Sequence, residues 1–131
     1  MIKIIDSEKE RYIEKINNIE HTVIVFITGE IWWTVDNKRH REDDNPAVKT
    51  PNGDKFWYKY NQLHRSKGLP AVISGKGQVF EWWINGLEHR GNGKPAYINK
   101  INNENSYYLE GKEVSEKSAI EYSLKNKLDK F

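Results

Sequence analysis

The sequence contains no cysteine, which excludes disulfide bonds, a thiol nucleophile and a thiolate metal site. Long apolar runs are also missing. None approaches the roughly 20 residues that a membrane helix needs, and the N-terminus lacks the apolar stretch of a secretory signal peptide. Neither sign of charge dominates, because 21 basic and 19 acidic residues leave a net charge of +2. This balance argues against a surface that binds nucleic acid or membrane. Because the chain also lacks cysteine, a signal peptide and a membrane helix, we expect a cytoplasmic protein.

The motifs of familiar enzyme classes are missing as well. The chain has no glycine-rich phosphate loop before a helix, no G-x-S-x-G nucleophile motif and no H-E-x-x-H zinc motif. The acidic run from Glu42 to Asp44 lacks the ligand spacing and the glycine of a calcium loop. We therefore predict a protein that is not an enzyme and that has no cofactor, no catalytic residue and no metal site.

The chain is instead rich in aromatic residues, which make up 12% of it and include five tryptophans. Many of them recur in three similar words: WTVDNKRHREDDNPA from Trp33, WYKYNQLHRSKGLPA from Trp57 and WWINGLEHRGNGKPA from Trp82. In each word a His-Arg pair begins seven residues after the Trp, and Pro-Ala begins thirteen residues after it. A less complete fourth copy begins at Tyr107. Such a fixed period indicates an array of one repeated structural unit.

Each copy predicts short strands joined by tight turns. A β-branched run follows Pro-Ala, and a Gly-bearing turn then leads into the aromatic strand. The next turn of the third copy is Asn85-Gly86, two residues that tolerate the positive φ of a type I′ hairpin turn. The first two copies carry Asp-Asn and Tyr-Asn there. We predict a mainly β fold, a single-layer antiparallel sheet of repeated β-hairpins, over residues 21–114.

The two ends of the chain predict caps for this array. Residues 1–20 are interpreted as an N-terminal α/β cap, with a helix over residues 7–18. Residues 115–131 are interpreted as a C-terminal helix that begins after Ser115. Its apolar positions are four residues apart, at Ile120, Leu124 and Leu128. Terminal segments that differ from the internal repeats are what a repeat array requires for solubility.

The pattern G-x-x-x-W-W-x-N-G-x-x-H-R-x-x-G-x-P-A resembles a repeat of phage and large-virus proteins. It is similar in length and hairpin layout to the MORN repeat, and the resemblance covers roughly residues 21–111. The first copy departs from it, since Asp44 or Asn45 stands where the later copies have Gly68 and Gly93. The resemblance implies a twisted single-layer sheet and a binding or scaffold role. It also implies a phage or viral source, and then the protein acts in the host cytoplasm.

The three His-Arg pairs allow two interpretations. In the functional one, Arg41, Arg65 and Arg90 are candidates for binding an anion, because a guanidinium binds phosphate or carboxylate in a bidentate way. In the structural one, each His binds a turn backbone or stacks on a ring, and each Arg lies over the aromatic strand. Successive units of a hairpin meander lie about 10 Å apart, which is too far for recurring His residues to share a metal ion or a catalytic step. We therefore favour the structural interpretation.

Strand alternation places further aromatic residues on the face opposite the repeated Trp. These candidates for partner binding are Trp32, Phe56, Tyr58, Tyr60, Trp83 and Tyr108. In one interpretation a terminal helix covers them and they belong to the core. In the other they stay exposed, and exposed Trp and Tyr are typical interface anchors.

Our leading hypothesis is a non-enzymatic module that binds a protein partner through this aromatic face or its edge. The phage-like resemblance suggests a host defence or regulatory protein, which is then inhibited. The second hypothesis is capture of a small anionic ligand such as a nucleotide, with rings on the base and Arg65 or Arg90 on the phosphate. An open sheet also exposes edges that allow a homodimer, whereas binding to nucleic acid or membrane is not expected.

Overall fold

The computed structural model describes residues 7–129, the last three by their backbone alone. Its one described helix is α2 (Glu116–Asp129). The strands are β1 (Glu8–Ile16), β2 (Ile19–Phe26), β3 (Ile31–Val35), β4 (Lys38–Arg39), β5 (Val48–Lys49), β6 (Lys55–Phe56), β7 (Tyr58–Lys59), β8 (Gln62–Leu63), β9 (Val72–Ser74), β10 (Val79–Glu81), β11 (Trp83–Ile84), β12 (Leu87–Glu88), β13 (Tyr97–Asn99), β14 (Glu104–Leu109) and β15 (Lys112–Val114).

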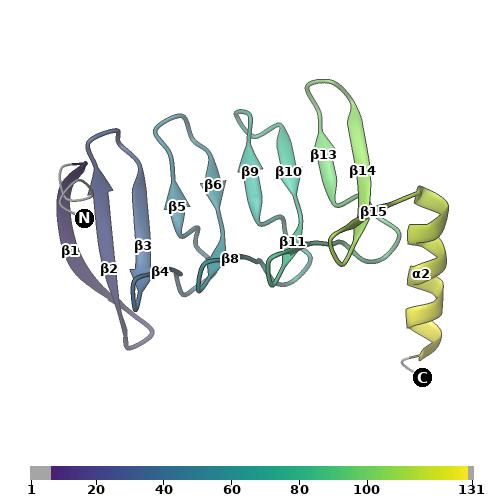
Figure 1. Cartoon of the computed structure of the whole chain (residues 1–131), viewed down its shortest axis with the longest axis horizontal. Helices are drawn as coiled ribbons and strands as arrows, with labels where there is room; N and C mark the ends of the chain where they lie inside the picture. The colour runs from purple at the N-terminus through teal and green to yellow at the C-terminus, as the bar shows by residue number, and fades with distance from the viewer. Residues whose placement is uncertain (1–6, 130–131) are drawn as a thin grey trace.

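Eleven of these strands form one open antiparallel sheet, in the order β1-β2-β3-β5-β6-β9-β10-β13-β14-β15, with β4 paired to β3. The pairs β7-β8 and β11-β12 are separate small hairpins. Figure 1 shows the repeated hairpins standing side by side along the longest axis of the molecule, with shorter hairpins beneath them. The predicted mainly β fold, an antiparallel sheet of hairpins followed by a C-terminal helix, is therefore confirmed.

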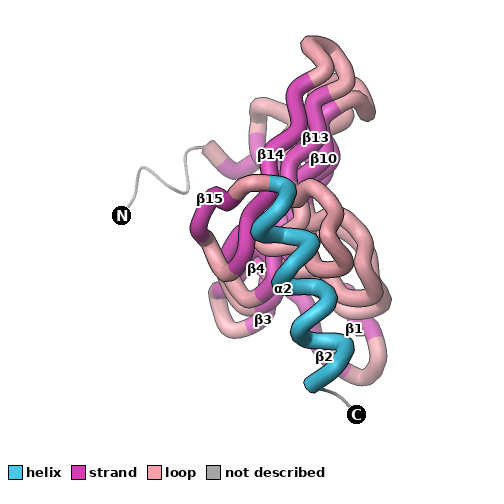
Figure 2. The backbone as a smooth tube through the Cα atoms, turned by 90° about the vertical axis from the view of Figure 1, so that its right-hand side faces the viewer, coloured by secondary structure: helices cyan, strands magenta, loops and turns pink. Residues whose placement is uncertain are grey.

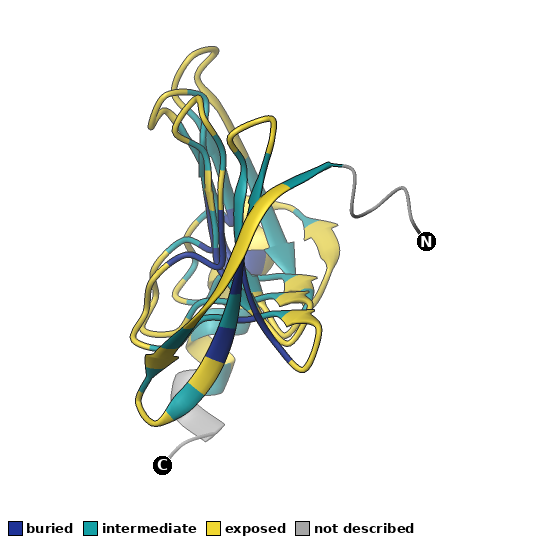
Figure 3. Cartoon of the chain, turned by 90° about the vertical axis from the view of Figure 1, so that its left-hand side faces the viewer, coloured by how far each residue is buried: buried dark blue, intermediate teal, exposed yellow. Residues whose placement is uncertain are grey.

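In the orientation of Figure 1, the upper hairpins are β2-β3, β5-β6, β9-β10 and β13-β14, and the lower hairpins are β3-β4, β7-β8, β11-β12 and β14-β15. Each repeated Trp lies where the chain passes from an upper hairpin into a lower one. The N–H of Trp57 donates to the carbonyl of Ala71 in the next unit at 2.8 Å, whereas its own carbonyl accepts the N–H of His64 at 3.0 Å. Trp82 repeats both bonds, with Ala96 and His89. The chain thus changes partner at Trp57 and Trp82, and the regular strand is interrupted at these two residues. Buried residues are concentrated where upper and lower hairpins meet (Figure 3).

The lower turns have the predicted two-residue geometry. Asn85 and Gly86 have φ of 48° and 82°, and Tyr60 and Asn61 have φ of 45° and 71°. Two successive positive φ values are what a type I′ turn requires, and its twist matches that of the flanking strands. The interpretation of these positions as hairpin turns is therefore confirmed.

The helix predicted over residues 7–18 is wrong. Residues 8–16 form β1, which pairs with β2 from Ile16 opposite Ile19 outward. Asn17 and Asn18 make the turn between them, with φ of 51° and 64°. Asn tolerates this left-handed backbone, so the hairpin forms, and its pairing with β2 outweighs a weak helical spacing of apolar residues. Residues 1–6 of the predicted cap lie outside the described residues.

The C-terminal helix lies at the end of the array (Figures 1 and 2). Ser115 caps it, because its Oγ accepts the N–H of Ser118 at 3.1 Å. Ala119 is buried, whereas Ile120 and Leu124 are 44% and 58% exposed, so the apolar stripe of the sequence is not the buried face. The side chain of Leu128 lies outside the described residues. None of the helical structure described is long and apolar enough to cross a membrane.

Candidate functional site

The three repeated tryptophans form what we call the inner row: Trp33, Trp57 and Trp82. Their exposed fractions are only 7%, 7% and 8%. Each indole N–H reaches back toward the preceding segment. Trp57 donates to the carbonyl of Asp44 at 3.1 Å and Trp82 to that of Gly68 at 2.9 Å. Trp33 has no complete unit before it and donates instead to the carboxylate of Glu14 on β1, so β1 takes the place of a preceding unit.

Each inner-row Trp carries the Arg of its own unit. The guanidinium carbons of Arg41, Arg65 and Arg90 lie 3.7, 3.8 and 3.8 Å from the ring centroids, within the range of a cation–π interaction. Each Arg also donates to the carbonyl of the Pro five residues later, in every case at 3.1 Å. Burial lowers the pKa of Arg41 and of Arg90 from the usual value. Each Arg thus lies over the aromatic strand, as the structural interpretation predicts.

The His residues join consecutive units. Nδ1 of His64 accepts the N–H of Asn85 at 2.9 Å, and Nδ1 of His89 accepts that of Glu110 at 2.9 Å. The first unit differs, because the ring of His40 stacks on Tyr60 with centroids 3.9 Å apart and its Nε2 lies 2.6 Å from Glu42. Nδ1 of His40 is buried and has no hydrogen-bond partner among the described residues. The His residues thus bind turn backbone or stack, as the structural interpretation predicts.

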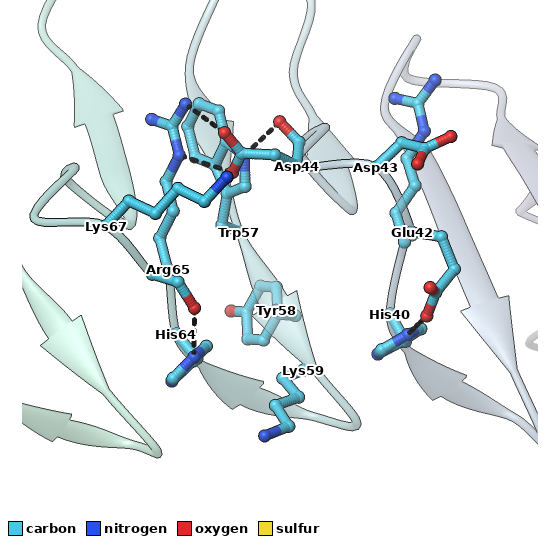
Figure 4. A pocket seen from close by; sticks show the side chains of 12 residues that line it. His40, Glu42, Asp43, Asp44, Trp57, Tyr58, Lys59, His64, Arg65 and Lys67 are labelled. Carbon is cyan, nitrogen blue, oxygen red and sulfur yellow. Dashed lines mark hydrogen bonds and ion pairs between the residues drawn. The ribbon is translucent and has the colours of Figure 1, made fainter. Parts of the chain in front are cut away.

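A pocket of about 270 Å³ lies between the first and second units (Figure 4). Asp44 reaches across it to Arg65, with Oδ1 2.9 Å from Nε and Oδ2 3.2 Å from Nη2. Basic Lys59 and Lys67 share the pocket with acidic Asp43, so it carries both signs of charge. Among the described residues, no group of His, Asp and Glu is arranged to hold a metal ion.

A second row of side chains follows the lower hairpins on the opposite face of the sheet. We call it the outer row, and it consists of Thr34, Arg39, Tyr58, Leu63, Trp83, Glu88, Tyr108 and Glu113. Its members are four directly opposed pairs: Thr34 with Arg39, Tyr58 with Leu63, Trp83 with Glu88, and Tyr108 with Glu113. Directly opposed residues of an antiparallel pair point to the same face. The row therefore brings together three of the predicted partner-binding residues.

Trp32 and Phe56 lie on the same face as the outer row, two residues before its members Thr34 and Tyr58. With Arg39 and Tyr58 they line a shallow pocket of about 230 Å³. The guanidinium of Arg39 lies 4.1 Å from the ring centroid of Tyr58 and 5.3 Å from that of Trp32. Tyr60 is placed elsewhere, because it occupies a turn and stacks on His40. Five of the six predicted aromatic residues thus share one face.

A groove on this face lies between the second and third units. It has a volume of about 500 Å³, and its lining includes Arg39, Tyr58, Leu63, Trp83 and Gly86. Tyr58 and Trp83 are half-buried, and no described element covers the groove. The interpretation in which a terminal helix covers the aromatic face is wrong for Tyr58 and Trp83, because α2 lies at the end of the array.

The far end of the outer row is acidic. Burial raises the pKa of Glu88 to about 7, and the carboxylates of Glu81 and Glu113 add to this shift. Glu81 accepts the indole N–H of Trp83 at 3.0 Å. Within the described part of the chain, neither Glu88 nor Glu113 forms a salt bridge.

The residues between the rings, Arg39, Leu63 and Glu88, were missed in the interpretation of the sequence. The signal for them is their position, six residues after each repeated Trp, at which the residue type changes from copy to copy. Comparisons of this chain with protein-family models, with curated proteins and with solved structures find no match. The function is therefore inferred from the geometry of the two rows.

Proposed function

We propose that this chain is a non-enzymatic module that binds a protein partner through the outer row and the aromatic residues beside it. The observation that supports this is the different setting of two sets of rings. The inner-row rings are buried and bonded within the fold, whereas Tyr58 and Trp83 flank an open groove. Half-buried aromatic residues beside a groove offer large contact area at a small entropic cost, as interface anchors do.

The resemblance to phage and large-virus repeats extends this proposal to the identity of the partner. A host defence or regulatory protein is the expected target, and occupation of its surface by the module inhibits it. The module works in the host cytoplasm in that case. The mass of the captured partner tests this extension directly.

A small anionic ligand such as a nucleotide is the second hypothesis. The pocket between the first two units favours it, because Lys59, Arg65 and Lys67 line that pocket. The acidic residues of the same pocket oppose it. Arg65 is already paired with Asp44 and bound to the carbonyl of Pro70, so an anion has to displace an existing ion pair.

The test is capture of the partner from a lysate of the cells in which the protein acts. Wild-type protein is compared with Tyr58→Ala and Trp83→Ala, and each substitution is expected to reduce capture about tenfold or more. The matched control is Ile101→Ser, because Ile101 is 67% exposed and lies in an upper turn away from the groove. Circular dichroism confirms that all variants are folded.

Two results contradict the proposal. One is equal capture by Tyr58→Ala, Trp83→Ala and Ile101→Ser. The other is native mass spectrometry of the wild-type protein that shows a nucleotide-sized ligand and no bound protein. If Arg65→Ala then folds normally and loses that ligand, the second hypothesis replaces the first.

A further inference from the structure

Two kinds of position alternate along the outer row. The position after each repeated aromatic residue holds a ring in three of the four units, namely Tyr58, Trp83 and Tyr108. The position six residues after each repeated aromatic residue forms the floor of a slot, and it is occupied in turn by Arg39, Leu63 and Glu88. Rings of the row flank Leu63 and Glu88 on both sides, whereas Arg39 lies between Thr34 and Tyr58. A residue that the fold requires recurs from unit to unit, as the inner-row Trp and Arg do. The residue type at the slot floor changes over the first three units, although Glu113 repeats the acid in the fourth, so these three positions are free to match a partner.

The first slot is positive. Arg39 lies against the rings of Tyr58 and Trp32. Its Nε donates to Asn61 at 3.1 Å, and in the described residues no carboxylate forms a salt bridge with it. A guanidinium that is held against aromatic rings in this way keeps donors for a carboxylate of a partner.

The second slot is apolar. Leu63 forms its floor between Tyr58 and Trp83, and Gly86 leaves the adjoining wall without a side chain. This slot belongs to the groove of about 500 Å³. A branched or ring-bearing apolar side chain fits a site of this chemistry, because it loses contact with water against two rings and a leucine.

The third slot is negative. Glu88 lies between Trp83 and Tyr108, and the carboxylates of Glu81 and Glu113 are near enough to raise its pKa. No cation of the described chain neutralises this group. A Lys or Arg of a partner relieves the repulsion among the three carboxylates and gains cation–π contacts with the flanking rings.

The spacing of the slots selects the conformation of the partner. Successive units are joined in the large sheet, to which each adds two strands, and neighbouring strands of a sheet lie about 4.8 Å apart, so equivalent positions of successive units are about 10 Å apart. A polyproline-II segment advances about 3.1 Å per residue with three residues per turn, so that every third side chain lies on one side at a repeat of about 9 Å. A β-strand does not match, because its residues at i and i+3 point to opposite sides.

We propose that the outer row binds a polyproline-II segment of a protein partner that carries an acidic, an apolar and a basic residue at every third position. The acidic residue lies over Arg39, the apolar residue over Leu63 and the basic residue over Glu88. Aromatic-lined surfaces suit this conformation because the segment is already extended and loses little entropy on binding. The inference rests on the proposed function and specifies its partner.

The test uses the full chain and labelled peptides in fluorescence anisotropy. The probe is PPEPPLPPKPP, together with its reversed sequence, because the segment can lie in either direction. One control peptide has Glu in place of Lys, and another places the same three residues two positions apart. We expect one of the two probes to bind, and each control to bind at least tenfold more weakly.

A charge exchange then tests the assignment of the third slot. Glu88→Lys is expected to reduce binding of the Lys probe at least tenfold and to restore binding of the peptide with two Glu residues. Lys112→Glu is the matched control, because it changes charge on an exposed residue outside the row. Binding of the Lys probe also strengthens between about pH 6 and pH 8, because the cation favours ionised Glu88, whose acidic neighbours are Glu81, Glu113 and Tyr108.

The outcomes separate this inference from the proposed function. The inference is overturned if neither probe binds, if the altered spacing binds equally well, or if Glu88→Lys leaves the preference for Lys unchanged. Tight binding of a helical peptide with the three residues seven positions apart also overturns it. In each case, continued loss of partner capture by Tyr58→Ala and Trp83→Ala leaves the proposed function standing. If neither Tyr58→Ala nor Trp83→Ala reduces the amount of partner captured, the proposed function itself is contradicted.

Discussion

The inner and outer rows lie on opposite faces of the same hairpins, one residue apart along the chain. Trp82 is buried, carries Arg90 and bonds to the preceding unit. The indole N–H of its neighbour Trp83 donates to Glu81, two residues earlier, and the ring remains half-buried beside a groove. The comparison separates rings that join one unit to the next from rings that the fold leaves half-buried beside a groove.

The largest effect is expected where the inner row is broken. Trp57→Ala removes a buried ring, its bond to Asp44 and the platform for Arg65. The expected loss of unfolding free energy is about 3–5 kcal/mol, to be measured by urea unfolding with circular dichroism. Trp83→Ala on the outer row is the comparison, and we expect it to cost less than half as much. Equal losses for the two rows contradict the distinction between them.

A smaller effect is expected for the Arg that lies on the same ring. Arg65→Ala removes the cation–π contact and the bond to Pro70, and we expect a loss of about 1–3 kcal/mol. Arg65→Lys keeps the charge but loses the planar guanidinium, so most of the loss remains. If Arg65→Lys is as stable as wild type in urea, charge alone accounts for the contact.

Alanine substitutions at two equivalent glycines test how tightly α2 packs against the end of the array. Gly68 and Gly93 have φ of 71° and 69°, so alanine is strained at both, by about 1 kcal/mol. A Cβ at Gly68 meets nothing within 4 Å, whereas one at Gly93 lies 3.1 Å from Cγ1 of Ile120. Gly93→Ala is therefore expected to have the lower melting temperature of the two. Identical melting temperatures would show that α2 moves away from the added methyl group without loss of stability.

The smallest expected effect is a dependence of stability on pH through His64, which joins the second unit to the third. Burial, with nearby Lys59, lowers the pKa of His64 below its usual value of 6.5. The unfolded chain then binds the proton more readily, so stability is present above pH 6.5 and is lost as pH falls through the folded-state pKa. Urea midpoints between about pH 7.5 and pH 5 check this. They are compared with His64→Asn, whose amide oxygen accepts the Asn85 N–H without titrating.

The pKa of Glu88, which is raised to about 7, acts in the opposite direction. Its ionisation costs stability as pH rises from 4.5 toward 7, because the unfolded carboxyl loses its proton more easily. The comparison of His64 with His64→Asn is therefore made in Glu88→Gln protein. A midpoint that falls equally in both shows that His64 is not the titrating group.

The recurring features could be predicted from the sequence because three copies repeat the same physical requirement. Trp, His-Arg and Pro-Ala in register predict hairpins, their turns and the stacking of each Arg, and these features are present. The terminal segments occur once each, so periodicity gave no support there. β1 was mistaken for a helix although Asn17-Asn18 carries a turn signal, and the buried side of α2 is not at Leu124.

The candidate site was predicted only where strict alternation continues. Trp32, Phe56, Tyr58, Trp83 and Tyr108 share a face as expected from their place in the strands. Tyr60 departs because a turn residue with positive φ no longer alternates with its neighbours. The slot floors were missed because each is an ordinary residue by itself, and they acquire a meaning only when equivalent positions of successive units are compared.

The two ends of the array terminate it in different ways. α2 lies against one end, whereas β1 is an edge strand of the described sheet. If β1 pairs antiparallel with a second copy about Tyr12, Lys9 lies opposite Lys15 and Glu10 opposite Glu14. Moving the centre of symmetry one residue either way again places like charges opposite each other, which is unfavourable. The charge pattern of this strand thus disfavours symmetric pairing of two copies through the β1 edge.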